Sequence, residues 1–373
     1  MHGTISRVSS HTPGRSRSES EGASDMPETG PGLRLSRFLA NPKIKLRDRL
    51  AQFSSFIEGE YQRDLLVGRE IAGPMGRTVR VRGPATGRGP TEGGRSTKWA
   101  RTMLMFGSNN YLGLANDPFV IERVRESLSR FGAGVAGPPM LGGTTSLHRL
   151  LERRLSRLKC AEDALLYPTG YAANLGWTGG LVGRRDALLL DERSHASTFD
   201  GARQTKARTL TFRHNDVADL HSKLQKLAAS GECVNLFVSV EGVYSMDGDL
   251  PPLDEIVPLC REFGAFLVVD DAHATGVLGE NGRGAAEHFG VEGQIDLVMG
   301  TFSKALAVTG GFLAGRKETI EYLRFFSRSY FFSASLPPMT VAAVLAGLEV
   351  IEREPERRAQ LHENVRYLLE GLR

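Results

Sequence analysis

The pattern of apolar and polar residues changes near residue 117. From there on, short and nearly continuous apolar runs alternate with stretches of helical periodicity. Apolar runs bounded by helices are typical of strands buried on both faces, and therefore of a mostly parallel sheet between helices. We predict an α/β fold with strands at 187–192, 234–242, 265–273, 296–304 and 310–315.

The chain before residue 117 has a different pattern. Residues 35–63 are amphipathic and predict a helix, and the stretches 79–83 and 103–107 predict two strands. A Gly- and Pro-rich segment between these strands predicts a flexible excursion. Residues 1–34 have no apolar core, so we expect a disordered tail and not a secretory signal. A transit peptide is the alternative, which the acidic residues of the tail disfavour.

The last residues, 339–373, predict two helical segments with no strand after them. An amphipathic helix needs a partner surface for its apolar face. We therefore expect four parts: the tail at 1–34, a helix and hairpin segment at 35–116, a large domain at 117–335, and the start of a small C-terminal domain at 336–373.

Composition excludes several classes of function. Of 373 residues, 40% are hydrophobic and 24% charged, and the net charge of +4 comes from scattered residues that give no reason to expect nucleic-acid binding. No apolar run reaches the ~18 residues that a membrane helix needs. Cys160, Cys233 and Cys260 are odd in number and lack metal-ligand spacing. They suit a reducing compartment, so we expect a cytoplasmic protein without a metal.

Polar side chains follow four of the predicted strands, at 191–195, 241–247, 270–273 and 301–304. In parallel α/β sheets, ligands bind at the carboxyl ends of the strands. One polar strand end means little by itself. Four of them together predict a single shared site.

Two of these strand ends carry an amine and an acid. Lys304 follows an apolar strand, where desolvation lowers the pKa of an amine and allows it to form a Schiff base, although a lone lysine is more often solvated. Asp270 follows LVV directly. It could be a capping residue or half of an ion pair, or it could keep a pyridinium nitrogen protonated, as in pyridoxal phosphate enzymes. Asp271 is interpreted as a structural residue that bonds turn amides.

Other candidates have a structural and a functional interpretation side by side. His273 could donate to the phenolic oxygen of the same ring or be an ordinary buried histidine. His195 could lie flat on that ring or cap a helix. Gly170 and Tyr171 lie at a predicted turn into a helix, whose amides could bind phosphate. An ordinary glycine turn is the alternative.

Hydroxyl groups complete this set. Thr301 and Ser303 precede Lys304 and could bond the same phosphate. Ser245, with Glu241 upstream, could bond the cofactor or the incoming substrate. Otherwise Ser245 is a turn hydroxyl.

Three stretches, EGVYSMDGDLPPLDEI, VVDDAHATGVLGENGRG and TFSKALAVTGG, resemble the α-oxoamine synthase family. The resemblance runs from SNNYLGL (108–114) to FFSASLPP (331–338). It implies the fold type I architecture of pyridoxal phosphate transferases and an obligate homodimer with shared sites. It also implies a decarboxylative condensation, in which an amino acid and an acyl thioester, carried by coenzyme A or a carrier protein, give an α-amino ketone.

The same resemblance implies roles around the cofactor ring. Lys304 would carry pyridoxal phosphate as a Schiff base and, once freed, would remove the α-proton of the amino acid. Asp270 would pair with the pyridine nitrogen, and His273 would bond the 3-oxygen of the ring. His195 would stack on the face of the ring.

Further roles concern the phosphate and the substrates. Gly170, Tyr171 and Thr301 would hold the phosphate, and Ser245 would line the cofactor. Glu241 and Asn109 would lie near the substrates. The segment with Ser333 and Ser335 resembles one that reaches the phosphate of the neighbouring subunit, although Ala334 stands where several members have threonine.

Two departures from the family refine the expectation. Where members that use succinyl-CoA resemble GGTRNISGTT, this chain has AGPPMLGGTT at 136–145. Pro138, Pro139 and Met140 replace polar residues, and a flexible methionine suits an acyl tail better than a carboxylate. We therefore expect an apolar acyl donor.

Family members also continue beyond the position of Arg373, so we expect a fragment or a partner that supplies the rest. Cofactor binding should be less affected than turnover.

Two alternatives remain at this stage. A fold-related aminotransferase would share Asp270 and Lys304, but it would not show the EGVYSMDGD and DERSHAS patterns so closely. A non-catalytic subunit of such a synthase would lose the lysine that this chain keeps at position 304. The sequence does not choose among glycine, alanine and serine as the amino acid.

Overall fold

The computed structural model describes residues 44–60, 70–82 and 100–372. The chain forms two compact units, one of which consists of Ile71–Arg82 and Ala100–Arg373. The other contains helix α1 (Leu46–Glu60), which agrees with the central part of the helix predicted at 35–63. The predicted tail at 1–34 and the excursion between the first two strands lie outside the described residues.

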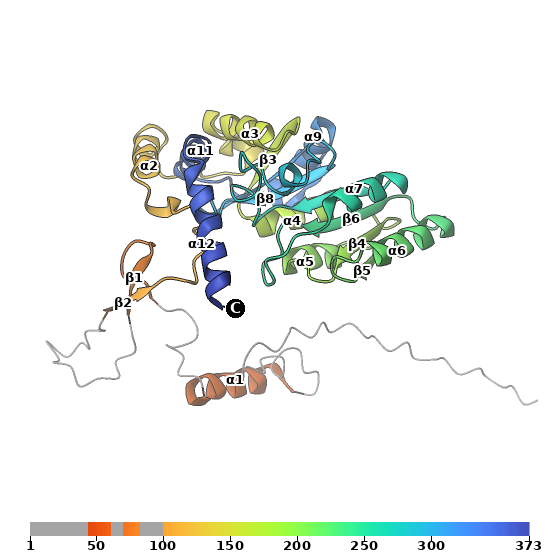
Figure 1. Ribbon diagram of the computed structural model, residues 1–373, viewed down its shortest axis with the longest axis horizontal. Helices are drawn as coiled ribbons and strands as arrows, with labels where there is room; N and C mark the ends of the chain where they lie inside the picture. Colours follow the sequence, from red (N-terminus) through yellow and green to blue (C-terminus); the bar gives the residue numbers. More distant parts are fainter. Residues whose placement is uncertain (1–43, 61–69, 83–99, 373) are drawn as a thin grey trace, which may run out of the picture. The chain divides into compact units, whose positions relative to one another are not determined.

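Within the described residues, seven strands form one sheet in the order β3-β9-β8-β7-β6-β4-β5 (Figure 1). The strands from β8 to β5 run parallel to their neighbours, and β9 runs antiparallel to both β3 and β8. The prediction of a mostly parallel α/β sheet is therefore confirmed. The strands are β3 (Asp163–Tyr167), β4 (Ala187–Asp191), β5 (Arg208–Phe212), β6 (Leu236–Glu241), β7 (Phe266–Asp270), β8 (Leu297–Thr301) and β9 (Gly311–Gly315).

Five of these strands coincide with the predicted apolar runs, and two were missed. β5 is the edge strand, and its sequence RTLTF leaves polar side chains exposed, so it lacks the continuous apolar pattern of a central strand. β3 has the sequence DALLY and lies at the opposite edge. Its apolar run is too short to be told from a helical segment by periodicity.

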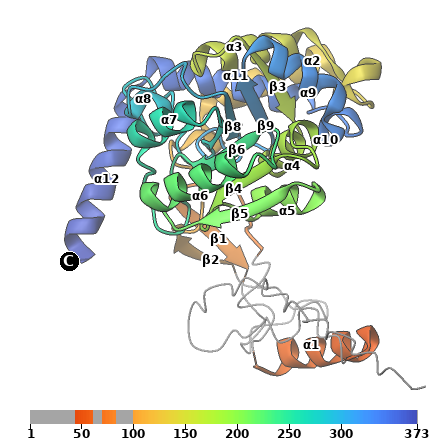
Figure 2. The same cartoon turned by 90° about the vertical axis from the view of Figure 1, so that its right-hand side faces the viewer.

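Helices cover both faces of the sheet (Figures 1 and 2). Alternate residues of each strand enter different apolar clusters: Leu267 and Val269 of β7 pack on one face, and Val268 packs on the other. One face carries α2 (Pro118–Phe131), α3 (Ser146–Leu158), α6 (Val217–Ser230), α7 (Leu253–Glu262), α8 (Ala285–His288) and α11 (Pro338–Arg353). The other carries α4 (Gly170–Leu181), α5 (Ala196–Gln204), α9 (Lys317–Phe326) and α10 (Arg328–Phe331).

The two strands predicted before residue 117 form an antiparallel hairpin of β1 (Thr78–Arg82) and β2 (Ala100–Leu104). The second strand begins earlier than the predicted 103–107. The ladder ends where Thr78 pairs with Leu104, because β1 begins at Thr78. The apolar stretch at 103–107 therefore includes only the end of this strand. Two short helical turns, η3 (Leu114–Asn116) and η4 (Pro139–Gly143), follow later in the chain.

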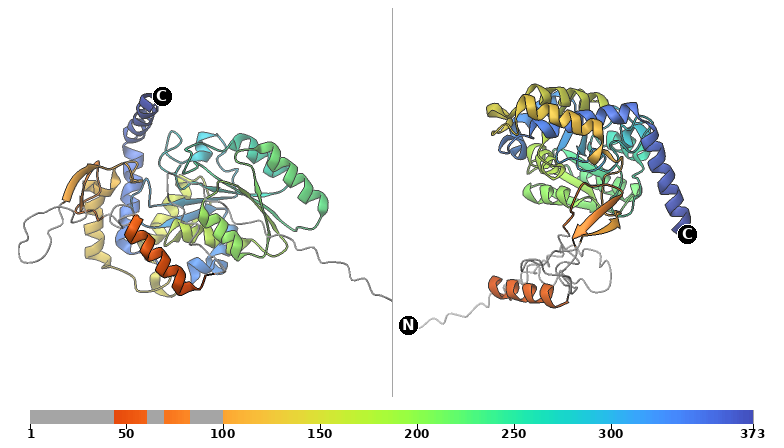
Figure 3. Two further views of the ribbon diagram at one scale, coloured as in Figure 1. Left: turned by 90° about the horizontal axis from the view of Figure 1, so that it is seen from below. Right: turned by 90° about the vertical axis from the view of Figure 1, so that its left-hand side faces the viewer.

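The two predicted C-terminal helices are present as α11 and α12 (Glu356–Leu372). α11 packs its apolar side chains among those of α2 and α3. α12 is anchored at its start, where the buried Arg358 guanidinium donates to the carbonyls of Ile351 (2.7 Å) and Glu280 (2.6 Å). Beyond His362, which bonds the Val277 carbonyl at 2.9 Å, α12 projects from the rest of its unit (Figure 3).

Strand register and one ion pair position the carboxyl ends of the strands. In the parallel ladder, Glu241 pairs with Asp270, and Asp270 pairs with Met299. Directly after β7, Asp271 binds Lys159 Nζ at 2.5 Å and accepts from the backbone N–H of Ala285 at 3.1 Å. Both side chains of this ion pair are almost fully buried. Asp271 is therefore structural, as expected, and fixes the turn after β7.

Replacing Lys159 with methionine tests this anchor. The variant keeps the apolar stem but leaves the Asp271 carboxylate buried without its cation, so we expect a loss of about 3–5 kcal/mol of unfolding free energy. Urea unfolding measures it. Arg123→Gln, which breaks an exposed ion pair with Glu126, is the matched control and should cause no measurable change. Equal effects of the two variants would contradict an anchoring role for Lys159.

Candidate functional site

A cavity of about 230 Å³ lies at the carboxyl ends of the parallel strands. It is bounded by the ends of β6, β7 and β8, by the start of α4, and by the segment that leads into α5. Predicted residues from all of these elements meet there. The lining residues are Thr169, Gly170, Tyr171, His195, Ser197, Glu241, Asp270, Ala272, His273, Met299, Thr301, Ser303 and Lys304.

Asp270 is the last residue of β7 and is only 4% exposed. Its Oδ2 accepts from Asn174 Nδ2 at 2.8 Å, and its Oδ1 accepts from the backbone N–H of Ala272 at 3.1 Å. Burial raises the pKa of this carboxyl, while the Asn174 hydrogen bond and the charge of Lys304 oppose the rise. The structure thus holds an acid with fixed orientation at the floor of the cavity.

Glu241 ends the neighbouring strand β6 and is also buried. Burial and the nearby Asp270 raise the pKa of its carboxyl to about 9, despite opposing contributions from the His195 backbone and Lys304. Glu241 Oε1 has no hydrogen-bond partner in the protein. A neutral carboxyl with a free oxygen is therefore available at the wall of the cavity.

Lys304 follows β8 and lies in the same cavity as the two acids. Burial lowers the pKa of its amine, and the charges of Asp270 and Glu241 oppose this decrease. A desolvated amine with a lowered pKa is a nucleophile and a base at moderate pH. The sequence-based expectation that Lys304 and Asp270 share one pocket thus agrees with the geometry.

His273 lies close to Tyr111, whose hydroxyl is 2.8 Å from His273 Nδ1 and 3.4 Å from Asn109 Oδ1. Burial, together with the charges of Lys304 and His195, lowers the pKa of His273 to about 4. The imidazole is therefore neutral. When Tyr111 donates to Nδ1, the ring proton of His273 resides on Nε2 and can be donated into the cavity.

His195 is the N-cap of α5, and its Nδ1 accepts from the Ser197 backbone N–H at 3.2 Å. The Ser197 hydroxyl lies 2.7 Å from the same nitrogen and accepts from Asn174 Nδ2 at 2.9 Å. Since Asn174 also bonds Asp270, one amide connects the histidine and the acid. The helix-cap interpretation of His195 is confirmed, and the side chain also lines the cavity.

Gly170 is the first residue of α4, and its backbone lies close to Thr301. A Cβ atom at Gly170 would lie 2.9 Å from Thr301 Cβ, so only glycine fits without a shift. Thr301 Oγ1 donates to the Gly310 carbonyl at 2.9 Å and lies 2.9 Å from Ser303 Oγ. The first amides of a helix have no partner inside that helix. This corner therefore offers amides and hydroxyls to an anion.

Most of the remaining predicted residues do not line the cavity. Tyr171 reaches the cavity, but its hydroxyl donates to Asp200 outside it. Ser245 lies on the exposed loop after β6 and is not among the lining residues. Ser333 and Ser335 are also absent from the lining. The Ser335 backbone donates to the Gly137 carbonyl at 3.1 Å.

Sequence reasoning missed Asn174, Ser197 and Tyr111. Asn174 lies one helical turn after Gly170, on the side of α4 that faces the strand ends, and its Oδ1 accepts from Trp177 Nε1 at 2.9 Å. The signal was a polar residue in an otherwise apolar helix, GYAANLGW. A buried amide needs hydrogen-bond partners, and Asn174 finds them in Asp270, Ser197 and Trp177.

In the described part of the chain, no helix is long and apolar enough to cross a membrane. The same residues contain no group of three or more His, Cys, Asp or Glu side chains that could hold a metal ion.

A family model, aminotransferase class I and II, matches residues 101–373. A serine palmitoyltransferase from Sphingobacterium spiritivorum is 46% identical over 272 residues, 73% of this chain and 67% of the relative. An 8-amino-7-oxononanoate synthase from Symbiobacterium thermophilum is 41% identical over 278 residues, 74% of this chain and 70% of the relative.

Solved structures agree with these relatives. A serine palmitoyltransferase variant from S. paucimobilis, with a bound aldimine of pyridoxal phosphate and myriocin, superposes with a TM-score of 0.75. Its sequence is 36% identical, and the match covers 87% of this chain and 78% of that one. The chain therefore belongs to the aminotransferase class I and II family and, within it, to the α-oxoamine synthases, which are acyltransferases that depend on pyridoxal phosphate.

Proposed function

We propose that this chain condenses a small amino acid with a long apolar acyl thioester, releasing carbon dioxide and the thiol and giving an α-amino ketone. The observation that carries the proposal is a single cavity in which Lys304 lies near two buried acids, Asp270 and Glu241. The names of the relatives support the reaction class. They also favour serine as the first amino acid to test.

The cavity fits pyridoxal phosphate. The unpartnered Oε1 of Glu241 and the amides at the start of α4, which have no partner inside the helix, are groups that a ligand can bind. Lys304 would bind the aldehyde group of the cofactor, and Asp270 would face its ring nitrogen. The amides at the start of α4 would hold its phosphate, and Thr301 would join them by exchanging its hydrogen bond to the Gly310 carbonyl for one to the phosphate.

When bound, pyridoxal phosphate supplies a protonated ring that accepts the electron pair left on the α-carbon of the amino acid. Asp270 keeps that ring nitrogen protonated, because a buried carboxylate favours a cation beside it. Lys304 takes the α-proton, since its lowered pKa leaves a fraction of the amine neutral. His195 would lie against the ring, and His273, with its proton on Nε2, would donate to the ring oxygen.

Glu241 acts as a hydrogen-bond donor in this scheme. With a pKa of about 9, its carboxyl carries a proton near neutral pH. A neutral acid beside Asp270 avoids a second buried negative charge. Glu241 can then donate to a carbonyl or carboxylate oxygen of a substrate that enters the cavity.

The segment 136–145 supports an apolar acyl group. It contains no charged residue that could pair with an acyl carboxylate. Met140 and Leu141 are 41% and 86% exposed in the turn η4. Exposed flexible apolar side chains of this kind suit a fatty chain.

We also propose a cytoplasmic homodimer that takes its acyl group from coenzyme A or a carrier protein. The three cysteines form no disulfide, which suits a reducing compartment. Large apolar side chains on α9 and after α10 are exposed, which favours self-association. They are Tyr322, Phe325, Phe326 and Phe332.

A thioester panel tests the acyl preference. With serine, kcat/KM for palmitoyl-CoA should exceed that for succinyl-CoA by at least about tenfold, since one or two apolar contacts give that discrimination. Carbon dioxide release and free thiol are measured together. Faster turnover of succinyl-CoA would contradict the apolar donor. Amino transfer to a keto acid without carbon dioxide release would instead indicate an aminotransferase.

Replacing Lys304 with alanine should remove both the Schiff base to the cofactor and the amine that acts as a general base. Borohydride should fix the cofactor to wild-type protein but not to the variant. Turnover should fall by at least about 10²–10⁴-fold, the usual contribution of a general base. Lys317→Ala, at an exposed lysine paired with Glu321, is the control and should behave as wild type. A borohydride label that persists in Lys304→Ala would place the Schiff base elsewhere.

Glu241→Gln tests whether this acid is neutral in the fold. The unfolded carboxyl loses its proton above its ordinary pKa, whereas the folded one keeps it to about 9, so the wild type loses stability as the pH rises between these values. The glutamine variant has no such loss. Its stabilisation over wild type should be at least about 1 kcal/mol larger at about pH 8 than at about pH 5. A difference independent of pH in urea unfolding would show that Glu241 is ionised.

A further inference from the structure

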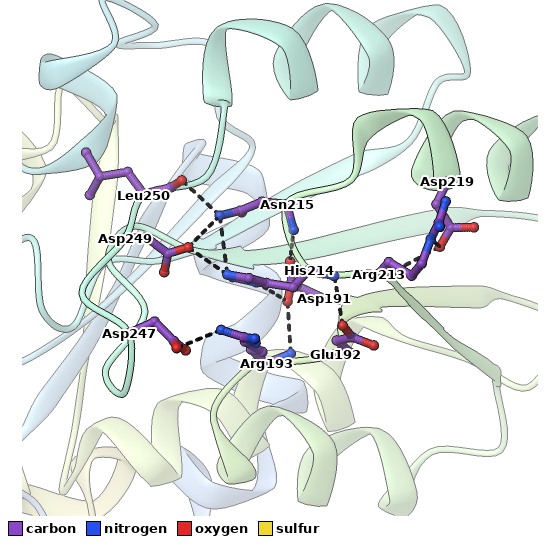
Figure 4. A network of polar contacts seen from close by, with 10 residues as sticks. All are labelled: Asp191, Glu192, Arg193, Arg213, His214, Asn215, Asp219, Asp247, Asp249 and Leu250. Atoms are coloured by element: carbon purple, nitrogen blue, oxygen red, sulfur yellow. Dashed lines mark hydrogen bonds and ion pairs between the residues drawn. The ribbon is translucent and has the colours of Figure 1, made fainter. Parts of the chain in front are cut away.

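A second polar cluster lies beside the cavity, at the ends of β4, β5 and β6 (Figure 4). At its centre is His214, whose side chain is 12% exposed. His214 Nδ1 lies 2.9 Å from Asp191 Oδ1, and its Nε2 lies 2.8 Å from Asp249 Oδ2. Neither acid lines the cavity. His214 thus connects the end of β4 to the loop after β6.

Both nitrogens of His214 face carboxylate oxygens, which accept hydrogen bonds when ionised. A neutral imidazole has one N–H, so only the imidazolium donates to both acids. Burial lowers the pKa of His214, but its bonds to Asp191 and Asp249 outweigh burial and raise it overall. The Tyr244 ring, edge-on at 4.5 Å, encloses the imidazole on another side.

Neighbouring bonds extend the same connection. Asn215 Nδ2 donates to Asp249 Oδ2 (3.0 Å) and to the Leu250 carbonyl (3.1 Å). The Asn215 backbone N–H donates to Asp191 Oδ2 at 3.0 Å. Arg193 and Asp247 form an ion pair of 2.7 Å between the two loops. Side chains therefore join the end of β4 to the segments that follow β5 and β6.

The joined loops carry residues of the cavity. Asp191 and Arg193 lead directly to His195, and the loop that contains Asp249 begins just after Glu241. The backbone N–H of Tyr244 donates to the Asp249 carbonyl at 3.0 Å. This bond fixes the backbone of the loop after β6. A movement of the segment between β4 and α5 would move His195 relative to Glu241, which the ladder holds at the end of β6.

We propose that His214 is a positioning residue for the reaction: by donating to Asp191 and Asp249 at once, it holds the segment between β4 and His195 and the loop after Glu241 in fixed relation at the cavity. This inference rests on the proposed function for the role of His195, but the connection itself does not need a cofactor. His214→Phe keeps a ring of similar shape against Tyr244 and removes both donors. Asp249→Asn, at a half-exposed acid, is the milder second variant in case His214→Phe folds poorly.

Hydrogen exchange of the protein without cofactor tests the connection directly. We expect amides at 192–195 and 243–249 to exchange at least about tenfold faster in His214→Phe, with a smaller change in Asp249→Asn. Amides at 272–284 should be unchanged. Arg213→Gln, at the exposed preceding residue, is the control and should match wild type. Unchanged exchange of both loops in both variants would overturn the proposal, whatever reaction the protein catalyses.

A double-mutant cycle tests whether His214 acts through His195. His214→Phe should raise the Kd for pyridoxal phosphate about tenfold in wild type and hardly at all in the His195→Ala background. The absorbance of the bound cofactor reports the Kd. An equal effect in both backgrounds would overturn action through His195. A wild-type protein that binds no pyridoxal phosphate would refute the proposed function, while the exchange result would still decide the connection.

Discussion

The fold brings an amine and two carboxyl groups together where little water reaches them. Parallel pairing of β6, β7 and β8 places Glu241 beside Asp270, and Lys304 follows the next strand. Burial raises the pKa values of both acids and lowers that of the amine. The charged forms of Asp270 and Lys304 are therefore stabilised mainly by each other, while Glu241 keeps its proton. A ligand that places a positive charge next to Asp270 stabilises the ionised form of this carboxyl group.

The supporting interactions are arranged around that constraint. Asn174 bonds Asp270 and Ser197, and Ser197 bonds His195, so acid and histidine are oriented through one buried amide. On the other side of the acid, the Lys159–Asp271 ion pair fixes the turn that leads to His273. Reactive groups need to be held within a fraction of an ångström to be effective, and these bonds supply that rigidity.

Sequence reasoning found the central strands and most of the site, because buried parallel strands have continuous apolar runs and their carboxyl ends are adjacent. It missed β5, whose exposed edge sequence RTLTF has no such run, and it placed β2 too late, because the length of β1 and not the apolar stretch sets the ladder. Asn174, Ser197 and Tyr111 were missed for a different reason. Their importance depends on which distant segments of the chain pack together, and one sequence does not show that.

The orientation of the cofactor ring is the central claim, and nitrogen-15 NMR of bound pyridoxal phosphate labelled at the ring nitrogen tests it most directly. If Asp270 faces that nitrogen, the signal should be that of a protonated pyridinium near neutral pH, and Asp270→Asn should convert it to that of a neutral pyridine. A neutral pyridine signal in the wild-type protein, or a pyridinium signal unaffected by the asparagine, would contradict the account.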